Sequence, residues 1–243
     1  MPEVLKPTGK KDRIVVLDVL RGFALVGILF ANILSWSGIK FMPIQDIRAL
    51  GDFEIDVLLY RLLKFFVDTK FYTIFSLLFG IGFSLQFTKN KNTPGFIPMY
   101  LRRLSILFII GCVHAFFWSG DILTLYAILG FIFVLFRNIK EEQILKIAIL
   151  FLALPVALDI VYMFVLNPQA VESSKEALTV YKDMTPQEVV AGFQSGNWLE
   201  TLKINWHNLK WRWIAFIPSG RPFKVLGLFL LGYYLFNTQF FNK

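Results

Sequence analysis

Long apolar runs, separated by shorter stretches that carry most of the charges, set the pattern of this chain. A run of about 20 apolar residues is long enough to cross the hydrocarbon core of a bilayer as a helix. Runs of this kind lie at about 14–36, 70–88, 103–119, 121–137 and 144–166, and a shorter run lies at 222–237. The pattern therefore predicts an all-α fold, a polytopic transmembrane helical bundle with about six spanning helices.

Two of the intervening segments predict helices outside the hydrocarbon. From Phe53 onward, the segment 37–69 has apolar residues at helical spacing and charges on the other face, which is typical of an interfacial helix. The segment 167–200 is polar and predicts an extracytoplasmic loop that contains short helices. Within it, Thr185 precedes a proline and stands three residues before Glu188, a pattern that predicts a helix N-terminus with a capping box.

The distribution of Lys and Arg predicts which ends of the runs face the cytoplasm. Basic residues gather before the first run, between the second and third, and between the fourth and fifth. The segment 37–69 holds four basic against five acidic residues, and 167–200 holds two against five. Cytoplasmic loops carry an excess of Lys and Arg, so we expect a cytoplasmic N-terminus with both acidic segments outside. The rule fails at 203–224, which holds five basic residues and no acid, and we expect an interfacial or re-entrant helix there.

The composition agrees with an integral membrane protein and narrows its chemistry. Of the 243 residues, 56% are hydrophobic and only 17% are charged. Cytoplasmic loops that face anionic headgroups account for the net charge of +8, so the lipid bilayer is the expected partner and nucleic acid is not. The single cysteine, Cys112, excludes an internal disulfide and a shared thiolate site, so we expect no metal.

The first run carries charges that a spanning helix does not need. Asp18 and Arg21 are three residues apart and are therefore neighbours on one helix face. Asn32 follows Arg21 by 11 residues, almost three full turns, so the two side chains share a face about 16 Å apart, and Ser35 continues it. Two interpretations stay open: an ion pair at the cytoplasmic end of the helix, or one wall of a polar cavity.

Three polar residues lie in or between the later runs. His114 is the candidate general base, because an imidazole exchanges a proton near neutral pH; a helix-packing hydrogen bond is the alternative. Asp121 fits either an N-terminal cap of the next helix or a carboxylate that orients His114. Asp159 follows the helix-kinking Pro155 by four residues and fits a partner of Arg21 or a group in a water channel.

A family resemblance lies in the stretches LDVLRGFALVGILFAN, KFYTIFSLLFGIGFS, RRLSILFIIGCVHAFFWSGDILTLYAILGFIF and GLFLLGYYL. Together they resemble the N-terminal portion of the YeiB-like bacterial membrane proteins. Through the first stretch, that family is similar to transmembrane acyltransferases such as heparan-alpha-glucosaminide N-acetyltransferase and the type-three enzymes that modify polysaccharides. The resemblance implies a multi-pass protein of the bacterial cytoplasmic (inner) membrane that passes an acyl group from a cytoplasmic acyl-CoA to an envelope acceptor, with no tightly bound cofactor. It also implies that Asp18 and Arg21 support the donor-side cavity and that Asn32 faces the reacting centre.

The chain departs from these relatives at three points. The type-three enzymes place a catalytic histidine where this chain has Asn32, and an amide cannot act as a general base at neutral pH. The heparan-type enzymes place theirs in the loop after the first helix, and residues 33–69 contain no histidine, so the role falls to His114 with Asp121. YeiB-like proteins usually continue with a second membrane segment. We therefore expect 1–243 to be a single transmembrane domain that resembles the N-terminal part of a larger fold, with the C-terminal family segment absent.

The first of three functional hypotheses is an acyltransferase-like protein. His114 deprotonates an acceptor hydroxyl or amine, Asp121 orients the imidazole, and Asn32 donates a hydrogen bond to the acyl oxyanion. The anionic donor is held near the cytoplasmic mouth by Arg21 with Arg102 or Arg103.

Two other hypotheses belong to different classes of protein. In one, the chain is a transporter or permeation subunit for a polar solute or protons, with Asp18, Asp159 and His114 as a relay. In the other, it is a non-catalytic half that needs a partner, either a second membrane chain or a further copy of itself.

Overall fold

A computed structural model describes residues 14–36, 39, 42, 44–51, 53–67, 69–165, 184–214 and 216–238. Every regular element in these ranges is a helix, which confirms the all-α prediction. In chain order the elements are α1 (Val15–Trp36), α2 (Ile44–Arg48), α3 (Phe53–Leu62), the π-helical turn η3 (Leu63–Val67), α4 (Lys70–Asn90), α5 (Phe96–Phe117), α6 (Leu123–Val134), the 3-10 turn η4 (Leu135–Asn138), α7 (Glu141–Val165), α9 (Pro186–Gln194), α10 (Trp198–Ile214) and α11 (Arg221–Asn237).

The six predicted apolar runs correspond to α1, α4, α5, α6, α7 and α11. Four described helical stretches are long and apolar enough to cross a membrane: Val15–Ile33, Glu54–Asn90, Phe96–Phe117 and Glu141–Val161. The remaining two helices, α6 with 12 residues and α11 with 17, are shorter. The structure therefore supports a membrane protein with several apolar helices, and spanning by α6 and α11 stays a prediction.

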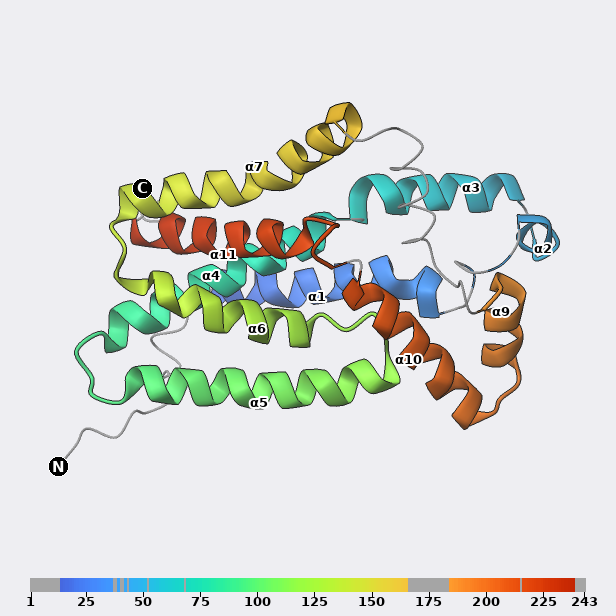
Figure 1. Ribbon diagram of the computed structural model, residues 1–243, viewed down its shortest axis with the longest axis horizontal. Helices are drawn as coiled ribbons and strands as arrows, with labels where there is room; N and C mark the ends of the chain where they lie inside the picture. Colours follow the sequence, from blue (N-terminus) through green and yellow to red (C-terminus); the bar gives the residue numbers. More distant parts are fainter. Residues whose placement is uncertain are drawn as a thin grey trace.

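The helix α11 lies at the centre of the bundle, packed against α4, α7 and α6 (Figure 1). Its residues Phe229 and Leu230 are fully buried. Phe229 stacks on Phe79 of α4 with ring centroids 4.3 Å apart and meets Phe133 of α6 edge to face at 5.7 Å. Aromatic side chains thus fill the core between these helices, as expected for a chain with 27 Phe.

Small residues allow α4 and α11 to approach each other closely. A Cβ atom on Gly80 of α4 would collide with the backbone carbonyl of Phe229. A Cβ atom on Gly232 of α11 would likewise collide with the carbonyl of Leu77. Close approach of backbones through glycine is a usual way to pack helices in a membrane, where no hydrophobic effect drives their association.

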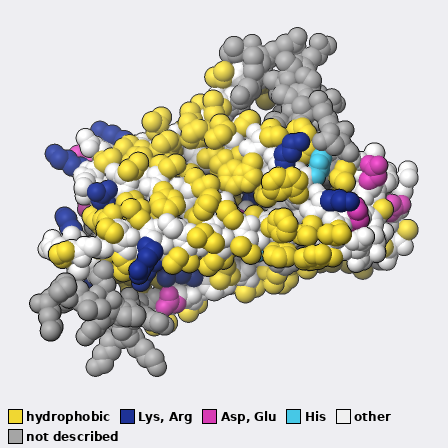
Figure 2. Space-filling model, turned by 60° about the horizontal axis from the view of Figure 1, so that its bottom comes forward, with side chains coloured by type: hydrophobic (Ala, Val, Ile, Leu, Met, Phe, Trp, Pro, Cys, Tyr) yellow, Lys and Arg dark blue, Asp and Glu magenta, His cyan; other side chains and the backbone are white. Residues whose placement is uncertain are grey.

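The outer surface of the bundle is apolar over much of its length. Figure 2 shows a broad hydrophobic face, with Lys and Arg side chains gathered toward its two ends. Large apolar side chains on this surface are strongly exposed, for example Leu135 at 71% and Phe164 at 80%. Soluble proteins rarely expose apolar patches of this extent, so the surface fits contact with lipid.

The predicted helix from Phe53 onward is present as α3, which continues into the π-helical turn η3. Figure 1 shows α3 running roughly parallel to α7 and α11.

The predicted capping box at Thr185 is confirmed: its hydroxyl accepts a hydrogen bond from the Glu188 backbone N–H, and the Glu188 carboxylate accepts one from the Thr185 backbone N–H. The N-terminal residues 1–13 and the stretch 166–183 of the predicted external loop lie outside the described residues.

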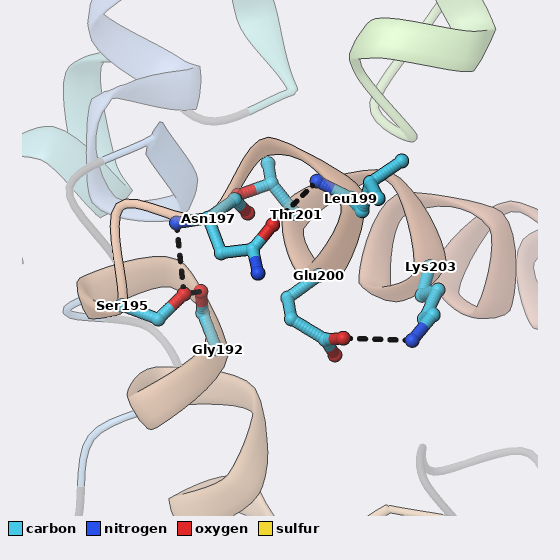
Figure 3. Close-up of polar contacts among 7 residues, drawn as sticks. All are labelled: Gly192, Ser195, Asn197, Leu199, Glu200, Thr201 and Lys203. Atoms are coloured by element: carbon cyan, nitrogen blue, oxygen red, sulfur yellow. Dashed lines mark hydrogen bonds and ion pairs between the residues drawn. The ribbon is translucent and has the colours of Figure 1, made fainter.

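The helix predicted within 203–224 is present as α10, which lies at one end of the bundle against α5 and α9 (Figure 1). The turn that leads into it is held by side chains (Figure 3). Ser195 accepts a hydrogen bond from the Asn197 backbone N–H at 3.1 Å, and the Asn197 side chain accepts one from the Leu199 N–H at 3.0 Å. Between them Gly196 has a φ of +64°, which glycine adopts without a steric penalty. These contacts fix the direction of α10.

Candidate functional site

His114 and Asp121 form a hydrogen-bonded pair where α5 turns into α6. The Nδ1 of His114 lies 2.7 Å from Oδ1 of Asp121. Since a carboxylate only accepts hydrogen bonds, this Nδ1 carries a proton and the neutral ring presents an unprotonated Nε2. The His114 side chain is 46% exposed, whereas that of Asp121 is 2% exposed. The pair therefore combines a buried carboxylate with an accessible imidazole.

The same carboxylate also caps α6. Oδ1 of Asp121 accepts a hydrogen bond from the Leu123 N–H at 3.0 Å, and Oδ2 accepts one from the Thr124 N–H at 2.8 Å. Both contacts that the sequence allowed for Asp121, with the start of α6 and with His114, are thus present at once. The cap holds the carboxylate rigidly on the α6 N-terminus, where the helix dipole favours its negative charge, and so fixes the direction of the bond to His114.

The turn between α5 and α6 is held from α10. Asn205, which is buried, donates a hydrogen bond to the Phe117 carbonyl at 2.7 Å. Arg212 donates one through Nη1 to the Ser119 carbonyl at 2.9 Å. Two side chains of α10, about two turns apart, therefore donate to the carbonyl of the last residue of α5 and to a carbonyl in the turn that follows it. This brings the Arg212 guanidinium to the turn that carries Asp121.

Arg212 also lines a cavity of about 360 Å³ between α4, α7, α10 and α11. We call this space the Arg212 cavity; its walls include Tyr72, Pro155, Arg212, Phe216, Arg221 and Lys224. Arg221 Cζ lies 5.9 Å and Lys224 Nζ lies 5.4 Å from the centre of the Tyr72 ring, within the range of cation–π attraction. None of the described residues that line the cavity is acidic.

Burial and charge act together on Arg212. Burial, with a smaller contribution from the charge of Arg221, lowers the pKa of Arg212 to about 10, and Asp121 opposes both effects. The guanidinium stays protonated at neutral pH. The lowered pKa indicates that the Arg212 charge is poorly solvated and lies near a second cation, Arg221. The negative charge of Asp121 compensates these two effects only in part.

Gly220 lets the chain turn from α10 into α11 at this cavity. Its φ is +64°, and a Cβ atom there would lie 2.6 Å from Cβ of Pro155 in α7. Only glycine fits both requirements without strain. The close approach places the first turn of α11, with Arg221 and Lys224, against the wall formed by α7.

The charged residues of α1 form a peripheral pair. Arg21 Nη1 lies 3.3 Å from Asp18 Oδ1, and their side chains are 37% and 50% exposed. The Arg21 guanidinium rests against Gly82 of α4, where a Cβ atom would collide with it. The amide of Asn32 donates its hydrogen bond to the Ile28 carbonyl in the same helix at 2.8 Å. Ion pairing, one of the two sequence interpretations, is thus present.

Asn32 and His114 lie on helices that do not pack extensively against each other in the described part of the chain. The helix α1 packs on α4 and η3, whereas α5 packs on α6 and α10. Asp159 lies exposed on α7, and Arg21 pairs with Asp18 rather than with it. The residues chosen from the sequence therefore divide into the His114–Asp121 pair at one end of the bundle, the Asp18–Arg21 pair on α1, and side chains elsewhere that join neither pair.

A second, larger cavity of about 820 Å³ lies at the opposite end of the α4–α11 pair. We call it the Arg137 cavity; its lining includes Leu17, Lys91, Arg137, Lys140, Glu141 and Asn237. Arg102 and Arg103, which the sequence assigned to a donor site, do not line it. Both are exposed on α5, and Arg103 donates a hydrogen bond to the Gln86 side chain at 2.9 Å.

Sequence reasoning missed Arg212, Arg221 and Lys224 as site residues. The signal that could have found them was the run of basic residues in 203–224 that breaks the loop pattern. Three of those five cations line the Arg212 cavity. The other two lie elsewhere: Lys203 pairs with Glu200 at 2.7 Å, and Lys210 lies 5.9 Å from the Trp211 ring centre.

The described residues contain no group of three or more His, Cys, Asp and Glu side chains that could hold a metal ion. Cys112 is free and exposed on α5.

Comparison with known proteins gives homologues whose names assign no activity. The chain is 37% identical over 206 residues to the uncharacterized protein YxaH of Bacillus subtilis (strain 168), which covers 76% of this chain and 50% of YxaH. It is 41% identical over 140 residues to an uncharacterized 39.9 kDa protein in the amylase 3' region of Bacillus acidopullulyticus, covering 57% of this chain and 38% of that protein.

The third relative carries the name that the sequence motifs suggested. The chain is 31% identical over 122 residues to the uncharacterized protein YeiB of Escherichia coli (strain K12), covering 50% of this chain and 30% of YeiB. No family model matches the chain, and no solved structure matches it either. The chain spans half or less of the length of these three relatives. Over the matched part it is a homologue of the bacterial proteins YxaH and YeiB.

Proposed function

We propose that the protein is a membrane acyltransferase-like protein in which His114 is the general base and Asp121 orients it. The observation that carries the proposal is the 2.7 Å contact between the half-exposed imidazole of His114 and the buried carboxylate of Asp121. That carboxylate also accepts hydrogen bonds from two backbone N–H groups at the start of α6. A carboxylate that fixes the tautomer of a histidine and stabilises its protonated form is the arrangement used by general-base catalysts.

The proposed reaction follows from this geometry. Nε2 of His114 takes the proton of an acceptor hydroxyl or amine, and the acceptor atom attacks the carbonyl carbon of an acyl thioester. A new carbon–oxygen or carbon–nitrogen bond forms, the carbon–sulfur bond breaks, and the leaving thiolate takes the proton back from the imidazolium. Asp121 stabilises the imidazolium that forms between these two proton transfers.

The donor is proposed to enter at the end that holds the Arg137 cavity. Lys91, Arg137 and Lys140 offer cations for the phosphates of an acyl-CoA there, in place of the three arginines chosen from the sequence. Arg103 donates a hydrogen bond to Gln86, the residue before Phe87 of the cavity lining, and stands 11 residues before His114 on α5, about 16 Å along the helix. In this proposal the thioester arm therefore extends along the bundle to reach the base. One N–H of the Asn32 amide donates to the Ile28 carbonyl, and this version assigns Asn32 no role.

The test measures release of CoA from acetyl-CoA by the purified protein in proteoliposomes made with bacterial envelope lipids. We expect His114→Asn to lower the rate by at least about a hundredfold. Cys112→Ser is the matched control, since Cys112 lies exposed on the same helix two residues earlier and should leave the rate unchanged. Equal rates for wild type and His114→Asn, or no release above empty proteoliposomes, would contradict the proposal.

A second candidate function is passage of an anionic solute. It is favoured by the presence of cation-lined cavities at both ends of the α4–α11 pair. Asp18 and Asp159 line neither cavity, so the proton relay has less support. Uptake of a labelled anion into proteoliposomes that is unaffected by His114→Asn and reduced by Arg137→Gln would favour passage over acyl transfer. Uptake equal to that of empty proteoliposomes would exclude it for the anion tested.

A further inference from the structure

The Arg212 cavity gathers three cations from two helices around one small space. Arg212 comes from the last turn of α10, and Arg221 and Lys224 come from the first turn of α11. The N-terminal end of α11 adds the positive end of its helix dipole. Pro155 and Phe216 form apolar walls. The result is a positively charged recess with apolar sides.

This charge has no sufficient counter-charge within the described part of the chain. None of the three cations forms an ion pair with a carboxylate in these residues. Asp121 is the one acid that acts on Arg212, and it already accepts hydrogen bonds from His114 and from two backbone N–H groups. Arg212 donates one hydrogen bond, from Nη1 to the Ser119 carbonyl. A guanidinium has five N–H donors, so Arg212 can also donate to a ligand.

Arg212 and Lys224 are partly buried, whereas Arg221 is exposed. Gathering like charges in a partly desolvated place costs free energy unless a ligand compensates them. Arginine binds phosphate oxygens through two parallel hydrogen bonds, and lysine adds a point charge. Three cations from two helices suit a phosphate group better than a carboxylate, which offers only two oxygens. A volume of about 360 Å³ lies at the small end of the range for ligand sites, enough for a phosphate with a short polar group attached.

We propose that the Arg212 cavity is a binding site for one phosphate group, carried either by a lipid headgroup or by a soluble phosphate ester. Arg212 and Arg221 hold the phosphate oxygens, and Lys224 closes the site on the side of Tyr72. The site stands on the cavity and its charges alone and does not depend on acyl transfer at His114. The cavity is linked to the His114–Asp121 pair through Arg212, which lines the cavity and donates a hydrogen bond to Ser119 in the turn that carries Asp121.

The experiment compares two variants with the same change in net charge. Arg221→Gln with Lys224→Gln removes two cations from the cavity, whereas Lys203→Gln with Lys210→Gln removes two cations of α10 that lie outside it. One arm measures binding of glycerol 3-phosphate to the delipidated protein in neutral detergent by calorimetry. The other arm measures retention of phosphatidylglycerol, relative to a neutral diacylglycerol, by native mass spectrometry.

We expect the cavity variant to bind about tenfold more weakly than wild type in at least one arm, and the α10 variant to stay within about twofold. Loss in the first arm identifies a soluble ester, and loss in the second identifies a lipid headgroup. Lys224→Arg should retain binding, which separates loss of charge from loss of fold. Equal binding by the two double variants, or no binding by wild type in either arm, overturns the proposal. His114→Asn should bind as wild type does, so failure of acyl transfer and failure of this site are distinguishable.

Discussion

α1 and α11 both pack against α4, but they do so in opposite ways. α11 meets α4 backbone to backbone, since Gly80 leaves no room for a Cβ atom beside the Phe229 carbonyl. α1 meets α4 through side chains, and at Gly82 its contact is the flexible end of Arg21. Most of α11 is buried, whereas most of α1 is exposed. We call the α4–α11 interface rigid, because backbone atoms face each other at Gly80, and the α1–α4 interface adaptable, because the Arg21 side chain at Gly82 can move.

The difference teaches where charge matters in this bundle. The charges that stand out in the sequence, Asp18 and Arg21, lie on the exposed helix and pair with each other at the surface. The cations that resemble ordinary loop charges, Arg221 and Lys224, lie at the start of the buried helix and line a cavity. A helix end that is fixed by close packing can hold cations together against their repulsion. A peripheral helix can move its charges toward water or headgroups.

The largest expected effect comes from Gly80→Ala, which tests the rigid interface directly. The new methyl group would meet backbone atoms that cannot move without separating α4 from α11. We expect a loss of about 3 kcal/mol in the free energy of unfolding, because overpacking a close interface costs about this much. Titration with sodium dodecyl sulfate in mixed micelles, followed by circular dichroism, measures it.

Gly82→Ala is the matched variant, two residues further along the same helix. Its methyl group displaces the tip of a flexible arginine, and the gain in helix propensity from Gly to Ala is about 1 kcal/mol. We expect the free energy of unfolding to change by less than about 1 kcal/mol. Gly22→Ala in α1, which meets open space, controls for propensity alone. Similar losses for Gly80→Ala and Gly82→Ala would remove the distinction between the two interfaces.

The next effect is expected at the end of the bundle where α11 begins. Asp121→Ala removes the cap of α6, the hydrogen bond to His114 and the acid that offsets Arg212. We expect a loss of about 2 kcal/mol in the same titration, the sum of a lost cap and a lost buried hydrogen bond. Asp121→Asn keeps an acceptor for the cap and should lose less. A loss no greater than that of Cys112→Ser would contradict the structural role of this carboxylate.

A smaller effect is expected from Asn205→Ala, which releases α10 from α5. The buried amide donates to the Phe117 carbonyl at 2.7 Å, and without it that carbonyl stays unpaired. We expect a loss of about 1.5 kcal/mol. Thr201→Ala should lose less, because Thr201 is only partly buried and its hydroxyl donates to the Asn197 carbonyl at 3.2 Å within the same segment. Hydrogen exchange should rise across 198–214 in Asn205→Ala alone; a rise in both variants would assign it to general fraying of α10.

The sequence was sufficient for the helices but not for the cavities. Apolar runs of spanning length and the Thr185 capping box depend on local chemistry, so residue patterns predict them. The contact between His114 and Asp121 could be predicted for the same reason, because one short turn separates the two residues. Arg212 and Tyr72 are 140 positions apart, and only packing of α4, α10 and α11 brings them to one cavity. A loop-charge rule counts cations but does not place them in space.

The smallest expected effect lies at the capping box of α9, the helix that packs on α10. The Thr185 N–H and hydroxyl both donate to the Glu188 carboxylate, and these bonds lower the pKa of Glu188 below its usual 4.5, the backbone bond contributing most. A group whose pKa is lower in the folded state stabilises that state above its unfolded pKa and loses this effect as the pH falls through the folded pKa. We therefore expect hydrogen exchange in 186–194, corrected for the intrinsic rate, to rise as the pH falls below 4.5. Glu188→Gln should abolish most of this dependence. If the rise persisted in Glu188→Gln, the acid sensitivity of α9 would come from another carboxylate, and this end of the bundle would not depend on its cap.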